Sequence, residues 1–197
     1  MPYMDRFTPT ERQLLIALPY RVGLWVSESD KSGGDDSDNA EMQAFEAMMT
    51  GYTEDLLKAE FVEELLRATI LAKKEWAGWT KNVDGVPNEI RKSIDICYNQ
   101  LPVSEINSLR QSLMEIAKTV AMAYREVEPE ELKGAEKMKI HFRYYRALLH
   151  SKLYKNPQPN LESFFNISDD EAVALKKLAE ILRVDMNGAP LEPVQKK

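Results

Sequence analysis

The sequence predicts an all-α fold, and three observations support this prediction. Apolar residues recur at intervals of three and four through most of the 197-residue chain. Residue patterns that begin helices, such as Thr8–Glu11 and Ser168–Glu171, precede these stretches. No segment alternates between apolar and polar residues for long enough to form a strand. We expect a compact bundle of about seven to eight helices in one domain over residues 1–187, followed by a mobile tail over 188–197.

The first predicted helix begins at an N-cap threonine, Thr8, with Pro9 at its first position. Pro19 lies inside the pattern, and we expect a kink there because proline removes a backbone donor. The polar residues after Ser27 predict a loop, and Asp38 begins the next helix, whose inward-facing residues are Met42, Phe45, Met48 and Met49. The apolar stripe of the first helix consists of Leu15, Leu18, Val22 and Trp25.

The later helices follow the same logic of apolar stripes and capping residues. Ser104 is the predicted N-cap of the most regular stripe, which continues to Val120. A proline-rich linker at 156–160 separates the last helix from the preceding one. The other helices are predicted over about 54–76, which can break once, over 88–100, from Pro129 to about Tyr154, and from Ser168 to about 184.

Charge and cysteine content narrow the class of protein. The chain has 26 basic and 32 acidic residues, a net charge of −6, which argues against nucleic-acid binding by the whole protein. The single cysteine, Cys97, cannot form an internal disulfide, which predicts a reducing compartment. We expect Cys97 to be a thiol in the core. There is no signal-peptide pattern and no apolar run near the roughly 20 residues that span a bilayer. We therefore expect a cytoplasmic protein.

The two halves of the chain share a weak internal repeat. An offset of 98 residues aligns the apolar stripe around Leu18 with the stripe around Ile116, and each long helix then ends in acidic residues. The halves cover about 8–98 and 104–184. If they are related, the Leu15–Trp25 face packs against the Leu109–Val120 face.

An acidic helix end, a loop and an acidic helix restart, present twice, resemble the TerB-like (tellurite-resistance-associated) family. The similar pieces are Leu14–Asp30 with Glu41, and Leu113–Leu132. The family's Ala-Asp-Gly at the helix end is replaced here by Ser29–Lys31 and by Ala123–Arg125. The resemblance implies a non-enzymatic cytosolic helical protein of the tellurite or stress response, with metal binding through its acidic cluster.

The first acidic loop is the candidate cation site. Asp30–Glu41 has the length and the acidic ends of an EF-hand loop, but Asp35 stands where that loop needs its turn glycine. A less regular site for Ca²⁺, Mg²⁺ or Mn²⁺ remains, since oxygen ligands predominate. Its alternative is a solvated loop whose Asp38 and Glu41 only cap the next helix. The candidate ligands are Glu28, Asp30, Asp36 and Glu41, with Glu126 or Glu128 from the second half.

Residues 137–155 have the opposite charge. They carry six basic residues, no acidic one and several aromatic residues, which leaves −12 for the rest of the chain. This segment can face the acidic half of the same molecule or form a solvated face, or it can bind a protein partner or a second copy; nucleic acid is the least favoured partner. The candidate partner-binding residues are Lys139, Arg143 and Arg146.

Catalytic patterns find no support in the sequence. His141 and His150 are nine residues apart, so one helix would point them in opposite directions. Neither a phosphate-binding glycine loop nor a nucleophile elbow is present. We therefore expect no enzymatic activity. The first functional hypothesis is the cation-binding TerB-like protein, and the alternative is a helical interaction module that docks through its separated acidic and basic surfaces.

Overall fold

The computed structural model describes residues 2–29, 45, 59–122, 167 and 169–191. These residues contain six α-helices and three short 3-10 helices, and their only strand-like feature is a single antiparallel bridge between Val184 and Pro190. The predicted all-α fold is confirmed. None of the helices in these ranges is both long enough and apolar enough to cross a membrane.

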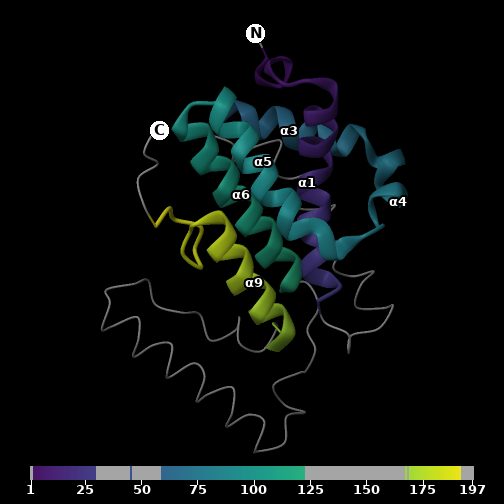
Figure 1. Cartoon of the computed structure of the whole chain (residues 1–197). Coiled ribbons are helices and arrows are strands. Elements are labelled where there is room, and N and C mark those ends of the chain that lie inside the picture. The colour runs from purple at the N-terminus through teal and green to yellow at the C-terminus, as the bar shows by residue number, and fades with distance from the viewer. Residues whose placement is uncertain (1, 30–44, 46–58, 123–166, 168, 192–197) are drawn as a thin grey trace, which may run out of the picture.

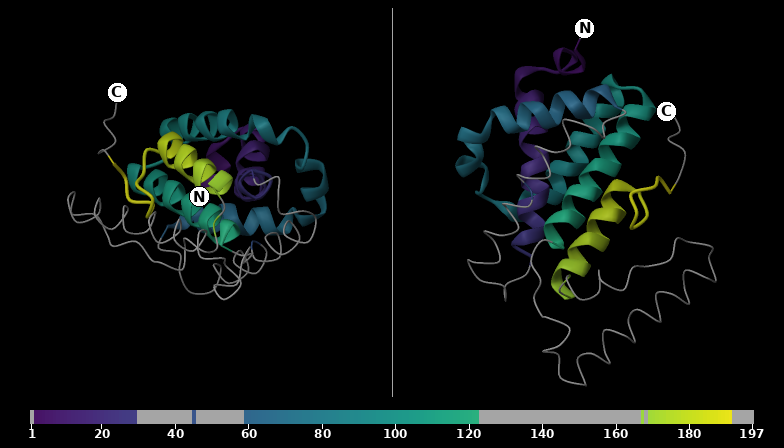
Figure 2. Two further views of the ribbon diagram at one scale, coloured as in Figure 1. Left: turned by 90° about the horizontal axis from the view of Figure 1, so that it is seen from below. Right: turned by 180° about the vertical axis from the view of Figure 1, so that it is seen from behind.

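Helix α1 (Pro9–Ser27) lies at the centre of the described bundle and packs against α3, α5 and α6 (Figures 1 and 2). The predicted capping box is present: the Glu11 N–H donates to Thr8 Oγ1 (3.4 Å), and the Thr8 N–H donates to Glu11 Oε2 (2.8 Å). The helix continues through Pro19. Every residue from Ala17 to Ser27 is buried, because neighbouring helices surround this half of α1.

The predicted helix over 54–76 is broken, as the sequence allowed. Its described part is α3 (Glu60–Leu71), which is followed by η2 (Lys73–Glu75), α4 (Trp76–Trp79) and η3 (Val83–Gly85). We call residues 72–85 the arch, because this stretch runs round one side of α1 and returns to the bundle (Figures 1 and 2). The arch brings the rings of Trp76 and Trp79 against Tyr20 of α1.

Helices α5 (Val86–Gln100), α6 (Val103–Ala121) and α9 (Asp169–Leu182) pack against one another beside α1. The predicted contact between α1 and α6 is confirmed; the duplication itself stays a prediction. The predicted N-cap of α6, Ser104, is wrong. The helix begins at Val103 with Pro102 as its N-cap, and the Pro102 carbonyl accepts from the Ile106 N–H (3.2 Å). Proline fits this position because its φ is fixed and the Pro102 backbone is already extended.

After α9 the chain forms a tight turn against α6. The Leu191 N–H donates to the Arg183 carbonyl (3.0 Å). Gly188 has φ +86°, and a Cβ there would lie 3.1 Å from Gln111 Cγ. Backbone pairing therefore continues to Leu191, beyond the predicted domain boundary after residue 187, while residues 192–197 lie outside the described part.

Candidate functional site

The structure places one of the predicted cation ligands, Glu28, at the C-terminal end of α1. Glu28 is the C-cap, and its N–H donates to the Leu24 carbonyl (2.9 Å). The adjoining Ser29 Oγ donates to the Val26 carbonyl (2.6 Å). The other candidates lie outside the described residues: the acidic Asp30, Asp36, Glu41, Glu126 and Glu128, and the basic Lys139, Arg143 and Arg146.

Glu28 and the helix dipole make a negative contribution to the electrostatic potential at this end of α1, and Lys177 of α9 makes a positive one, with its Nζ 5.6 Å from the centroid of the Trp25 ring. The last turn of α1 carries backbone carbonyls at the negative end of the helix dipole and no basic side chain. Tyr20 is buried in the same half of α1. Burial, and to a smaller extent the charge of Glu28, raises the pKa of its hydroxyl. A divalent cation at this end would meet carboxylate and carbonyl oxygens, which are the ligands of hard cations.

The chain returns to the same region at Phe45. This side chain is fully buried, and a Cβ on Gly23 would lie 3.2 Å from Phe45 Cδ2. Gly23 is four residues before Ser27, which is about 6 Å along a helix axis. Ser29 and Phe45, the described residues on either side of the predicted acidic loop, therefore both lie beside the C-terminal half of α1.

Phe45 is one member of an aromatic cluster that joins α1 to the arch. Its ring centroid lies 5.7 Å from that of Tyr20 and 5.5 Å from that of Trp76. Tyr20 also contacts Trp76 (4.8 Å) and Trp79 (5.9 Å). The Trp76 Nε1 donates to the Thr69 carbonyl (3.0 Å), so the polar atom of this buried indole is satisfied. Edge-to-face and tilted pairs at these distances are favourable aromatic contacts.

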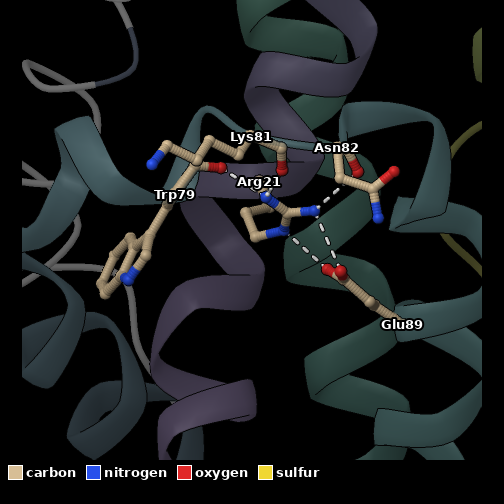
Figure 3. Close-up of polar contacts among 5 residues, drawn as sticks. All are labelled: Arg21, Trp79, Lys81, Asn82 and Glu89. Carbon is tan, nitrogen blue, oxygen red and sulfur yellow. Dashed lines mark hydrogen bonds and ion pairs between the residues drawn. The ribbon is translucent and has the colours of Figure 1, made fainter.

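Arg21 makes the second connection between α1 and the arch (Figure 3). The Arg21 Nε donates to Glu89 Oε2 (2.6 Å), and Nη2 donates to Glu89 Oε1 (2.9 Å), which is a bidentate ion pair. Nη1 donates to the carbonyls of Trp79 and Lys81 (2.9 Å to the latter), and Nη2 also donates to the Asn82 carbonyl (3.1 Å). All five N–H donors of the guanidinium therefore have an acceptor.

Sequence reasoning missed the contacts of Arg21 with the arch and the ring partners of Phe45. A signal for Arg21 was present, because it is the only charged residue between Arg12 and Glu28 and it lies inside an apolar helix. A lone charge in such a position is buried only when partners satisfy it. Phe45 was predicted to face inward, but its partners on the arch are distant in sequence and gave no signal.

The thiol interpretation of Cys97 is confirmed. Cys97 is fully buried in the core, and burial raises the pKa of its thiol to about 12. The thiolate, which is the reactive form, is therefore almost absent near neutral pH.

Within the described ranges, no three His, Cys, Asp or Glu side chains gather closely enough to hold a metal ion. Comparisons of the chain with protein-family models, with curated proteins and with solved structures gave no match.

Proposed function

We propose that this protein is a non-enzymatic helical protein that binds a hard divalent cation at the C-terminal end of α1. The observation that carries the proposal is that Ser29, which adjoins Glu28, and Phe45 both lie beside the C-terminal half of α1. The acidic residues 30–44 lie between these two positions in the sequence and are themselves outside the described part. This segment contains five acidic residues and one basic residue. Crowded carboxylates repel one another, and a divalent cation relieves that repulsion.

The resemblance to TerB-like proteins adds a biological setting to this proposal. Under it, the protein acts in a metal or stress response such as tellurite resistance, in the cytoplasm. The proposed ligands are Glu28, Asp30, Asp36 and Glu41, with Glu126 or Glu128 from the second half of the chain. Oxygen ligands favour Ca²⁺, Mg²⁺ or Mn²⁺ over Zn²⁺, since Cys97 is buried in the core and both histidines lie far away in the sequence.

Isothermal titration calorimetry of the full chain with each of these cations tests the proposal. We expect binding by the wild type and its loss in the double variant Asp30→Asn, Glu41→Gln. The matched control is Asp169→Asn, Asp170→Asn, which also removes two negative charges, from the first turn of α9. The control should keep the affinity of the wild type. Absence of heat with millimolar cation, or equal loss in both double variants, would contradict the proposal.

The charge distribution favours one alternative, a helical interaction module. Residues 137–155 carry six basic side chains in a chain whose net charge is −6. In this alternative Lys139, Arg143 and Arg146 bind an acidic surface of a partner protein or of a second copy. Light scattering at low and high salt tests the second copy: a dimer that dissociates with salt and with charge reversal at these three positions would favour the module.

A further inference from the structure

We infer that the arch opens and closes as one unit, that Arg21 is the latch that holds it closed, and that opening removes the Trp76 ring from its contact with Phe45. The latch is argued from contacts within the described residues alone. Its consequence for cation affinity rests on the proposed function, because Phe45 ends the segment that contains the acidic loop.

The polar attachment of the arch to α1 is concentrated on one side chain. The carbonyls of Trp79, Lys81 and Asn82 all accept hydrogen bonds from Arg21, which is only 7% exposed. Trp79 is the last residue of the one-turn helix α4 and Lys81 follows it, while the Asn82 carbonyl also accepts from the Gly85 N–H (3.1 Å). Loss of the guanidinium would leave all three without this donor at once, so they should be released together.

Apart from the Arg21 contacts and the rings of Trp76 and Trp79, the arch buries little of its surface. Within the arch only Trp76 and Val83 are buried. Its helical pieces are a single turn each, which is too short for stability without tertiary contacts. Asn82 has φ +57°, a left-handed conformation that persists because surrounding contacts impose it. Segments with few buried apolar groups are those that open at low cost.

The arch is coupled to Phe45 through Trp76. The Trp76 ring contacts both Phe45 and Tyr20, and Trp79 contacts Tyr20 from the same segment. Opening of the arch would remove the Trp76 ring from Phe45. Phe45 would then pack only against Gly23 and Tyr20 of the residues named above. A ligand that binds better when Phe45 packs on Trp76 must then favour the closed arch, and opening of the arch must lower the affinity for that ligand, because such coupling is reciprocal.

Hydrogen exchange measured by mass spectrometry on the full chain tests the latch without any cation. In Arg21→Met we expect peptides covering the arch to exchange at least about tenfold faster, since several charge-assisted hydrogen bonds are lost. Peptides of α6 should exchange as in the wild type. The matched control is Arg110→Met, which removes another buried arginine that has no contact with the arch and should leave arch exchange unchanged.

A second variant keeps the test informative if Arg21→Met does not fold. Gly78 lies in α4, and a Cβ there would have no atom within 4 Å. Gly78→Ala should therefore favour the closed arch and slow its exchange roughly two- to fivefold, with no effect on α6. Unchanged arch exchange in Gly78→Ala, equal acceleration of arch and α6 in Arg21→Met, or arch acceleration in Arg110→Met would overturn the latch.

The coupling is tested by Phe45→Ala, which should also accelerate exchange of the arch. In wild type, saturating Ca²⁺ or Mn²⁺ should slow arch exchange, because a cation that binds better to the closed form lowers the population of the open form. No heat with any cation would contradict the proposed function and leave the latch result standing. If the wild type binds a cation but the arch of Phe45→Ala exchanges at the wild-type rate, the coupling is overturned and the proposed function is supported.

Discussion

Arg21 on α1 and Arg110 on α6 are both almost completely buried, with 7% and 3% of their surface exposed. Arg21 has an acceptor for each of its five donors, including both oxygens of Glu89. Arg110 donates from Nη2 to the Tyr98 hydroxyl and lies 5.4 Å from the centroid of that ring. Its Nε is buried without a partner, and no carboxylate in the described part of the chain pairs with it.

The difference shows that burial alone does not tell what a charged residue contributes. Removing a guanidinium from water is costly, and the cost is offset only by good acceptors. Around Arg21 these acceptors come from the arch and from α5, so the side chain joins three parts of the fold. Around Arg110 a cation–π contact worth about 0.5–2 kcal/mol is set against an unsatisfied donor that costs about 1–3 kcal/mol. We therefore expect a large loss of stability when Arg21 is replaced by an apolar residue and little change when Arg110 is.

The largest expected effect is that of Arg21→Met. It removes the Arg21 donors from the Glu89 carboxylate and from the carbonyls of Trp79, Lys81 and Asn82, of which only Asn82 keeps a second donor among the described residues, the Gly85 N–H. We expect the free energy of unfolding to fall by about 3 kcal/mol. Urea denaturation followed by helical circular dichroism measures this. Arg21→Lys is the control: it keeps the charge but cannot reproduce the bidentate fork, so its loss should be intermediate. A loss within 1 kcal/mol for Arg21→Met would break the comparison.

A smaller loss is expected from Glu89→Gln. The amide keeps one acceptor but presents an N–H₂ group to the guanidinium, so one of the two hydrogen bonds and the ion pair are lost. The side chain of Glu89 is 28% exposed, and solvent screens part of the pair. We expect a loss of about 1–2 kcal/mol in urea denaturation, decreasing with added salt. A loss that does not depend on salt would mean that the hydrogen bonds, rather than the charges, stabilise this junction.

Gly78→Ala should have the opposite sign. Alanine restricts the unfolded chain and suits the single turn of α4, where its Cβ meets no other atom. We expect a gain of about 0.5–1 kcal/mol if the arch unfolds with the rest of the protein. If thermal unfolding is unchanged while arch exchange slows, the arch opens independently of the global transition, which sharpens the distinction between the Arg21 and Arg110 regions.

What the sequence could predict follows the range of the interactions. The Thr8–Glu11 capping box and the apolar stripes depend on residues within one or two turns, and both were predicted correctly. The error at Ser104 was also local: Pro102 supplies an N-cap carbonyl without a side-chain bond, which a search for capping side chains does not find.

The junction at Arg21 could not be predicted because it depends on partners 58–68 residues away in the sequence. The residue type shows that a lone buried arginine needs acceptors. Every residue has a backbone carbonyl, however, so the sequence does not show that the carbonyls of the arch are those acceptors. The same holds for Phe45, whose inward position was predicted and whose aromatic partners were not. Among the predicted cation ligands the structure places Glu28 alone, so the composition of that site stays a prediction.

The smallest expected effect is that of Arg110→Met. Methionine retains most of the apolar stem, which occupies space between α5 and α6, and removes a charge that has no carboxylate partner among the described residues. The losses are one hydrogen bond and one cation–π contact with Tyr98, and the gain is relief of the buried Nε donor. Because these terms are similar in size, we expect an unfolding free energy within about 1 kcal/mol of the wild type.

Tyr98→Phe is the companion variant of Arg110→Met. If Arg110 depends on the Tyr98 hydroxyl, Tyr98→Phe destabilises the wild type but has no effect in the Arg110→Met background. A loss near that of Arg21→Met would show that Arg110 has a counter-charge, and the contrast between the two arginines would be wrong.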